Sequence, residues 1–293
     1  AITALVLQRN PRLSISEVEF SELRSARAAL RAAFTLEEIY DLVLGNFHEL
    51  AVSALNAAVS EMTKWKQSYE EHFDVRVEFN RRSLNLLSAA RLYLDQYSQW
   101  MKEVGADSTS VRKLANNLYD SHFEYRFMEA LRNHVQHVGL AVHGVNYQSK
   151  WLPPNKWERM EFSVSPYTSR SALASDAKFK SSVLSECPEQ VPIVPTSQVY
   201  VQCLSNLHGE LRKLVDPVAK DARDRIQAAI ARHAEAAAEV IPGLTAVAFE
   251  GTASVEEVPL LLDWDDVRIK LAAKNRTLRA LGKSYVSSRA SDA

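Results

Sequence analysis

The sequence predicts a mainly α protein, in which a long antiparallel helical bundle precedes a smaller helical C-terminal domain with minor β structure. The chain has 293 residues, is 46% hydrophobic and 24% charged, and contains only 8 glycines. This composition is typical of a helix-rich globular protein that can bury a sizeable core. Apolar residues recur at spacings of three and four over long stretches of the first half, whereas residues 151–195 combine prolines with alternating polar and apolar residues.

The first long helix is expected from Thr35 to about Lys66. Thr35-Leu36-Glu37-Glu38 has the Thr-x-x-Glu form of a capping box, in which a hydroxyl and a carboxylate satisfy free N–H groups at a helix start. Apolar residues then continue at helical spacing without a proline. Residues 1–35 are expected to form a separate N-terminal segment.

Two more long helices are expected in the first half of the chain. One runs from about Val75 to Val104, with Gly105 just beyond its end. The next begins after the capping candidates at 107–110 and continues to about Val142. Helices of about 30 residues joined by short connections predict an up-down bundle over residues 36–150.

The sequence pattern of the second half of the chain differs from that of the first. Residues 151–195 are expected to form a linker with short strands, because their prolines exclude a helix interior. Residues 196–293 are expected to form a C-terminal domain with a helix to Val215 and a second helix opened by Asp216-Pro217. Segments 245–250 and 255–262 predict a strand pair, and a basic helix is expected from about Asp263.

Composition and short motifs also limit the classes of function that are expected. The net charge is −1, but residues 267–291 carry seven basic residues and no acidic one, so a basic tail follows an acidic body. Two cysteines are too few for a disulfide framework, and no secretory signal or membrane span is recognised, so a cytoplasmic location without a membrane partner is expected. The sequence contains no GxGxxG, GxxxxGK[ST], GxSxG or HExxH pattern, which disfavours P-loop, α/β-hydrolase and zincin chemistry.

Histidines gather in one stretch late in the third expected helix. His122, His134, His137 and His143, four of the chain's eight histidines, fall within 22 residues. His134 and His137 are three apart and can share a helical face, yet no acidic residue stands three or four positions before His134. This spacing disfavours a zinc site, and we expect neither a metal nor another cofactor.

Acid–base chemistry on a phosphodiester fits the stretch better. Histidine exchanges protons near neutral pH, and arginine offers a planar, permanently charged fork to phosphate oxygens. Arg132 and His137 supply one residue of each kind. Five residues along a straight helix place them roughly 140° apart around the axis, so either the helix end is distorted or a second copy of the chain completes the site.

Residues 132–137, Arg-Asn-His-Val-Gln-His, are the chain's only Arg-x4-His sequence. This pattern resembles the R-x(4–6)-H signature of the HEPN superfamily, the higher eukaryote and prokaryote nucleotide-binding domains, over at most residues 36–150. The resemblance implies a compact helical bundle that often dimerises and that is often a metal-independent ribonuclease of toxin–antitoxin or phage-defence systems. It further implies Arg132 and His137 as the catalytic pair and Asn133 as a residue that orients them. Our working hypothesis is therefore a homodimeric endoribonuclease that cleaves RNA and leaves 2′,3′-cyclic phosphate ends. An antitoxin or another defence-system protein is a candidate partner. Some family members carry a tyrosine two residues after the histidine, where this chain has Gly139.

Two alternatives stay open. The histidines can be polar residues on a solvated helix face, with Arg132 paired to Glu129 on the same helix. The protein would then be a non-catalytic helical scaffold or a regulatory interaction protein of a defence system. His134 and His143 are candidates to line a groove in the catalytic interpretation.

The basic C-terminal helix also has two interpretations. Its side chains can neutralise phosphates of a nucleic acid, or they can form the solvated face of a packed helix, which is the interpretation we favour. The candidate nucleic-acid contacts are Arg268, Lys270, Lys274, Arg276 and Arg279.

Overall fold

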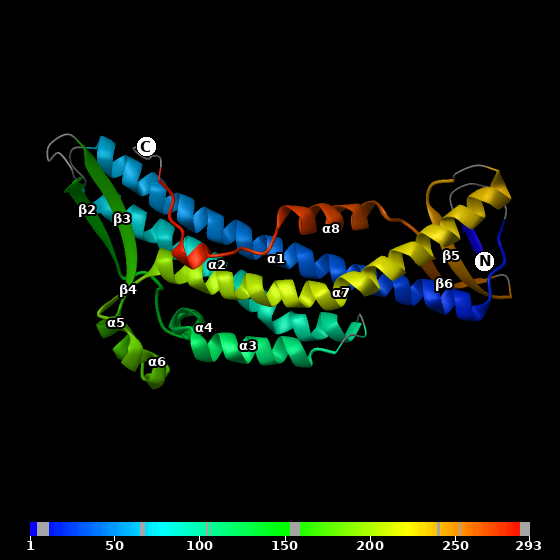
Figure 1. The fold of residues 1–293 in the computed structure, drawn as a ribbon, viewed down its shortest axis with the longest axis horizontal. Coiled ribbons are helices and arrows are strands. Elements are labelled where there is room, and N and C mark those ends of the chain that lie inside the picture. Colours follow the sequence, from blue (N-terminus) through cyan, green and yellow to red (C-terminus); the bar gives the residue numbers. More distant parts are fainter. Residues whose placement is uncertain are drawn as a thin grey trace. The chain divides into compact units, whose positions relative to one another are not determined.

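A computed structural model of the chain describes residues 1–4, 12–64, 68–103, 105, 107–152, 159–238, 241–251 and 253–287. The protein is mainly helical with two small antiparallel sheets, which confirms the predicted fold class at this level (Figure 1). By contacts the chain divides into two compact units. The first comprises Ala1–Asp41, Leu94–Ser110 and Gly209–Arg276, and the second Leu42–Tyr93, Val111–His208 and Thr277–Ala293. Because each unit combines separate stretches of chain, the four consecutive ranges expected from the sequence stay a prediction.

The first helix, α1 (Glu17–Thr63), begins far earlier than expected. Ser16 caps it, since its hydroxyl accepts the Glu19 N–H at 3.1 Å. Thr35 therefore lies inside a helix, and the capping box predicted there is wrong. The physical reason is that apolar residues at helical spacing continue upstream: Leu23, Ala26, Leu30, Ala33, Leu36 and Tyr40 are all buried.

The second helix, α2 (Tyr69–Glu103), ends where it was expected to end but begins before the expected Val75. The third expected helix is instead two, α3 (Thr109–Ser121) and α4 (Phe123–His137), and it ends before Val142. Asp107 caps α3, because its carboxylate accepts the Thr109 N–H at 2.9 Å. His122, in an extended conformation, separates the two helices.

The helix α7 (Ile193–Ala237) is continuous, so the predicted start of a new helix at Asp216-Pro217 is wrong. Pro217 lacks an N–H and cannot bond to the preceding turn, which weakens a helix locally. The buried stripe nevertheless continues across it at spacings of three and four, through Leu207, Leu211, Val215, Ala219, Ala222 and Ile226. Packing along this stripe outweighs the local cost of the proline.

In the first unit, the early part of α1 and the late part of α7 are joined by ion pairs. Glu22 pairs with Arg225 at 3.3 Å, Glu19 pairs with Arg232, and both oxygens of the Glu37 carboxylate accept hydrogen bonds from Arg212, at 2.7 and 2.5 Å. Residue numbers rise along α1 as they fall along α7, so these two segments run antiparallel. The Glu37–Arg212 pair is buried, with side-chain exposures of 4% and 14%.

The first unit also contains a three-stranded antiparallel sheet in the order β1-β5-β6. Its strands are β1 (Ile2–Ala4), β5 (Leu244–Glu250) and β6 (Ala253–Pro259), which confirms the expected strand pair. The following helix, α8 (Asp263–Lys274), is shorter than the basic helix expected over 267–291. Arg276 and Arg279 lie beyond its end, and Arg289 lies outside the described residues.

In the second unit, a three-stranded antiparallel sheet has the order β2-β3-β4. Its strands are β2 (Gly144–Trp151), β3 (Met160–Ser169) and β4 (Gln190–Pro192). Two short helices, α5 (Arg170–Ala174) and α6 (Ser181–Glu186), lie between β3 and β4, and a 3-10 turn, η1 (Leu281–Lys283), lies near the C-terminus. The short strands expected in 151–195 are therefore present, but this region also forms helices.

Among the described helices, α1 alone is long and apolar enough to cross a membrane by length and composition. A core helix of a globular protein meets the same criteria, so this is weak evidence. The expected absence of a membrane partner stays a prediction.

The Glu37–Arg212 pair should contribute strongly to stability. We expect Glu37→Ala to lower the free energy of unfolding by about 3–5 kcal/mol in urea denaturation, because it leaves a buried guanidinium unpaired. The double variant Glu37→Met/Arg212→Leu should recover part of this loss, since no buried charge remains. Asp224→Ala, which removes the exposed partner of Lys220 on α7, is the control and should cost less than about 1 kcal/mol. A loss below about 1 kcal/mol for Glu37→Ala would contradict this account.

Candidate functional site

The histidine-rich stretch lies on α4 and the segment that follows it, in the second unit. The buried face of α4 consists of Tyr125, Phe127, Met128, Ala130, Leu131 and His134. Its partner is the early part of α7, because the Tyr125 and Tyr200 rings lie at a centroid distance of 5.3 Å. The Tyr200 hydroxyl donates to the Glu129 carboxylate at 2.6 Å. Burial and the nearby Glu129 charge raise the pKa of Tyr200 well above its usual range.

These contacts argue against the interpretation in which Arg132 pairs with Glu129. Glu129 instead accepts the Tyr200 hydroxyl and lies 3.5 Å from Arg91. Arg132 is half-buried, donates from Nη1 to Asn133 Oδ1 at 3.0 Å, and has a buried Nε without a hydrogen-bond partner. Within the described part of the chain Arg132 makes no ion pair, so its charge is not neutralised by a carboxylate.

A pocket of about 340 Å³ lies along one face of α4, and we call it the α4 pocket. Asn133, His134 and His137 line it, together with Tyr119, Glu129, Ala130, Val138, Asp176, Lys178, Phe179 and Lys180. The α4 residues Ala130, Asn133, His134 and His137 share a face because they are spaced at threes and fours. Arg132 is not among the lining residues. The helix is regular through His137, so one chain does not bring Arg132 and His137 to a common point.

His134 is buried, with 4% exposure, and His134 Nδ1 lies 2.8 Å from Asp176 Oδ2. The Lys178 N–H donates to the other oxygen of Asp176 at 2.9 Å. The hydrogen bonds from His134 and from the Lys178 backbone hold the pKa of Asp176 below its usual value. The Phe179 ring packs edge-on against His134, 6.2 Å away. The turn after α5 is thereby fixed against α4, and this turn supplies residues that the sequence analysis did not identify.

The end of α4 is also held by side chains from elsewhere in the unit. Asn80 Nδ2 donates to the Val142 carbonyl and Asn80 Oδ1 accepts the Val142 N–H, each at 2.9 Å. Thr168 Oγ1 donates to the Ala141 carbonyl at 2.5 Å. These bonds, with the bond from the His143 N–H to the Tyr167 carbonyl, hold residues 141–143 outside a helix. Gly144 opens β2 where a Cβ atom would lie 2.3 Å from the Tyr167 hydroxyl.

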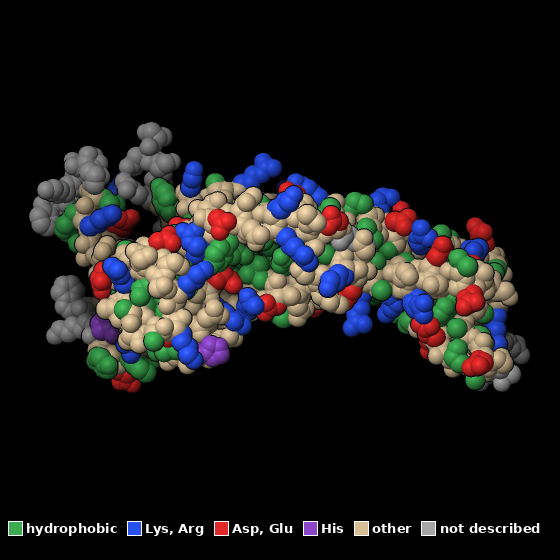
Figure 2. All heavy atoms as spheres, turned by 90° about the horizontal axis from the view of Figure 1, so that it is seen from below, with side chains coloured by type: hydrophobic (Ala, Val, Ile, Leu, Met, Phe, Trp, Pro, Cys, Tyr) green, Lys and Arg blue, Asp and Glu red, His purple; other side chains and the backbone are tan. Residues whose placement is uncertain are grey.

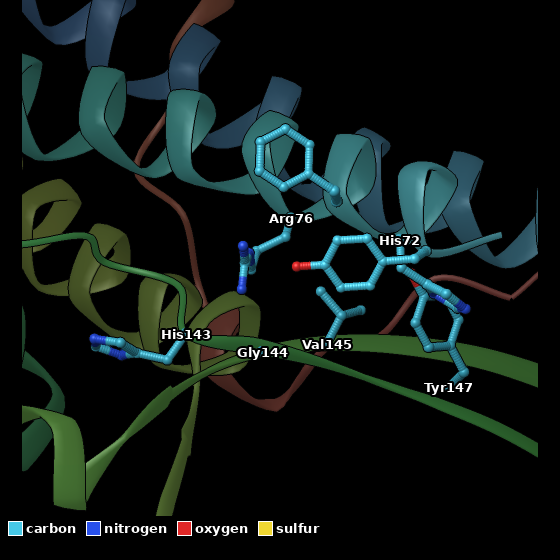
Figure 3. A pocket seen from close by; sticks show the side chains of 8 residues that line it. His72, Arg76, His143, Gly144, Val145 and Tyr147 are labelled. Atoms are coloured by element: carbon cyan, nitrogen blue, oxygen red, sulfur yellow. The ribbon is translucent and has the colours of Figure 1, made fainter.

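His143 does not line the α4 pocket. It lines a separate pocket of about 270 Å³ with Arg76, Tyr147 and others, and Figure 3 shows its ring turned away from His72 and Tyr147. His143 Nδ1 accepts the Ser169 N–H at 3.2 Å, and burial, His134 and Arg76 lower its pKa. His143 is therefore a neutral residue that links the end of α4 to β3. Of the two candidate groove residues, the structure places only His134 beside His137.

The candidate nucleic-acid contacts divide into two groups. Arg268 is buried and bonded to Asp265 at 2.5 Å, which disfavours it as a phosphate contact. Lys274 is exposed but lies 2.7 Å from Asp41. The remaining three, Lys270, Arg276 and Arg279, are exposed. Basic and acidic side chains are interspersed over the face shown in Figure 2.

Within the described residues, neither the cysteines nor a metal-binding cluster offers an alternative centre. Cys187 and Cys203 are buried, and desolvation raises their pKa to about 11 and about 12, so both stay protonated near neutral pH. Over the described ranges, no cluster of three or more His, Cys, Asp and Glu side chains could hold a metal ion.

No protein-family model, curated protein or solved structure matches this chain. The residues of α4 and their contacts are therefore the basis for any functional proposal.

The Asp176–His134 pair predicts a specific pH dependence of stability. A carboxyl group whose pKa is lowered by folding stabilises the fold above its unfolded pKa, about 3.9, and this contribution disappears as the pH falls through its folded pKa. We expect wild type to exceed Asp176→Asn in melting temperature at pH 7, and the difference to shrink below about pH 4. Asp74→Asn, at an exposed position of α2, is the control and should show no such trend. A difference that stays constant from pH 7 to pH 2 would exclude this role for Asp176.

Proposed function

We propose that the protein is a metal-independent endoribonuclease of the HEPN type, acting at α4 as a homodimer. The observation that supports it best is the state of Arg132: a half-buried guanidinium on the helix that carries His137, oriented by Asn133 and paired with no carboxylate that the structure describes. A structural arginine would normally have its charge compensated at such a depth. An uncompensated one is suited to bind an anion such as a phosphodiester.

The roles follow from the chemistry of each side chain. Arg132 would bind the scissile phosphate and stabilise the charge that develops on its oxygens. His137, exposed at the end of the helix, would take part in proton transfer. Removal of the ribose 2′-OH proton lets O2′ attack phosphorus, the P–O5′ bond breaks, and protonation of O5′ leaves a 2′,3′-cyclic phosphate and a 5′-hydroxyl. Asn133 would hold the guanidinium through the bond between Oδ1 and Nη1.

The dimer is part of this proposal because one chain places Arg132 and His137 on different sides of α4. A twofold pairing of two α4 helices would supply Arg132 from one copy and His137 from the other at the same phosphate. The helical bundle expected over residues 36–150 belongs to the proposal as well. An antitoxin or another defence-system protein would be the controlling partner of such an enzyme.

The direct experiment is incubation of the purified protein with single-stranded RNA in excess EDTA, followed by analysis of the fragment ends. We expect wild type to leave 2′,3′-cyclic phosphate ends, and Arg132→Ala and His137→Ala to cleave at least about 100-fold more slowly. Arg112→Ala and His48→Ala, at exposed positions of α3 and α1, are matched controls and should cleave at the wild-type rate. Circular dichroism verifies that each variant folds. If wild type leaves RNA intact, or if both site variants cleave normally, the alternative of a non-catalytic interaction protein replaces this proposal.

A mixing experiment tests the shared site. If each site takes Arg132 from one chain and His137 from the other, a mixed dimer of Arg132→Ala and His137→Ala chains contains one intact site. Random pairing of equal amounts should then restore about a quarter of the wild-type rate. Sites contained within single chains would stay inactive in the mixture, and that result would contradict a site shared between two copies.

A further inference from the structure

The α4 pocket contains two histidines on one helical face. His134 and His137 are three residues apart, so their side chains project from neighbouring turns to the same side, and both line the pocket. One is buried and held by a carboxylate, whereas the other is exposed. A pair of histidines in different environments can divide the work of proton removal and proton donation.

The contact with Asp176 determines how His134 can act. With the carboxylate ionised, the bond at Nδ1 places the ring proton on Nδ1 and leaves the lone pair of Nε2 free. This is the arrangement in which a carboxylate orients an imidazole as a base. Gly139 lies against the same nitrogen, since a Cβ atom at this position would be 3.0 Å from Nε2.

The turn that carries Asp176 also contributes two positively charged side chains to the pocket. Lys178 and Lys180 line the pocket with exposed side chains, and neither forms an ion pair in the described part of the protein. Lys180 Nζ instead donates to the Tyr119 hydroxyl at 2.5 Å and lies 4.9 Å from that ring's centroid. The two acidic lining residues, Glu129 and Asp176, are already engaged by Tyr200 and His134. An anionic group in the pocket would therefore meet two cations that form no ion pair in the described part of the protein, and two carboxylates that already have partners.

We propose that the α4 pocket is a two-histidine phosphodiester site, in which His134 is the base, His137 the acid, and Lys178 and Lys180 bind the phosphate. His134 Nε2 takes the 2′-OH proton as O2′ bonds to phosphorus, and protonated His137 gives its proton to O5′ as the P–O5′ bond breaks. Asp176 is a positioning residue that holds the Nδ1 tautomer of His134. This inference rests on the proposed ribonuclease activity and assigns to it a second catalytic histidine and a phosphate subsite from residues 176–180.

A substrate with a changed leaving group distinguishes the role of His137 as the acid from that of His134 as the base. In an RNA with a 5′-bridging sulfur at the cleavage site, the leaving thiolate needs no proton. We expect His137→Ala to be at least about 100-fold slow on ordinary RNA and close to wild type on the sulfur substrate. We expect His134→Ala to be slow on both. Rescue of His134→Ala by the sulfur substrate would overturn the assignment of His134 as the base.

Because His134 is buried, its removal could disturb folding, and a second variant avoids this difficulty. Gly139→Ala leaves both members of the Asp176–His134 pair in place but puts a methyl group against Nε2. We expect it to keep the wild-type melting temperature to within a few degrees and to lower the cleavage rate about tenfold or more, because a small displacement at a reacting group is costly. A folded Gly139→Ala variant with the wild-type rate would overturn the role of His134.

Binding of an uncleavable probe tests the lysines without reference to activity. The probe is a fluorescein-labelled single-stranded RNA of twelve 2′-O-methyl nucleotides, followed by fluorescence anisotropy in EDTA. We expect Lys178→Ala/Lys180→Ala to raise Kd about tenfold and to reduce the slope of log Kd against log salt concentration by about 1.5. Lys113→Ala/Lys150→Ala, which removes two exposed lysines outside the pocket, is the matched control and should change Kd less than about twofold. Equal losses in the two double variants would overturn the phosphate subsite.

The two proposals fail in different ways. If wild type cleaves RNA and depends on Arg132 and His137, but folded His134→Ala and Gly139→Ala cleave at the wild-type rate, the ribonuclease proposal stands and the two-histidine site is wrong. If wild type leaves both RNA and the sulfur substrate intact, both catalytic proposals are wrong.

Discussion

The candidate site depends on the buried pair between His134 and Asp176. The two residues are 42 positions apart in the sequence, and the bond between them fixes the turn after α5 against α4. The same carboxylate accepts the Lys178 N–H, so the turn's own backbone is ordered by this contact. Burying a carboxylate is costly unless its oxygens are bonded, and here both are. Together with the packing of Phe179 against His134, the pair fixes the residues that line the pocket opposite α4.

The fold class could be predicted from the sequence because helical periodicity is a local signal. The errors occur where a local signal competes with packing. Thr35 has the sequence of a helix start, and Pro217 has that of a helix boundary, yet buried stripes continue through both. At the end of α4 the opposite occurs: the sequence continues helically, but Asn80 and Thr168 bind the backbone of residues 141–142 outside a helix. Such contacts come from other elements and leave no trace in the local pattern.

Only part of the candidate site could be predicted from the sequence, because a local pattern identifies residues of α4 but not the residues that contact them from other elements. Arg132, Asn133 and His137 lie within six residues, so a local motif identifies all three, although Arg132 does not line the α4 pocket with the other two. Asp176 and the two lysines lie in a segment expected to be a linker with strands, and no periodicity marks them. The sequence suggested His134 only as a candidate groove residue. Its burial against the Asp176 carboxylate is a finding of the structure. Arg132 donates to Asn133 at 3.0 Å, and the role of Asn133 in orienting the arginine stays a prediction.

Nuclear magnetic resonance of the histidine rings can detect whether the polar face of α4 binds RNA. Their Cε1–Hε1 signals would be followed while a 2′-O-methyl dinucleotide is added in EDTA, with His137→Ala, His134→Ala and His48→Ala used to assign the signals. We expect saturable shifts at His134 and His137, whereas the signal of His48, which is remote in sequence and exposed on α1, should stay unchanged. No shift at His134 and His137 under saturating dinucleotide, or equal shifts at His48, would contradict this expectation.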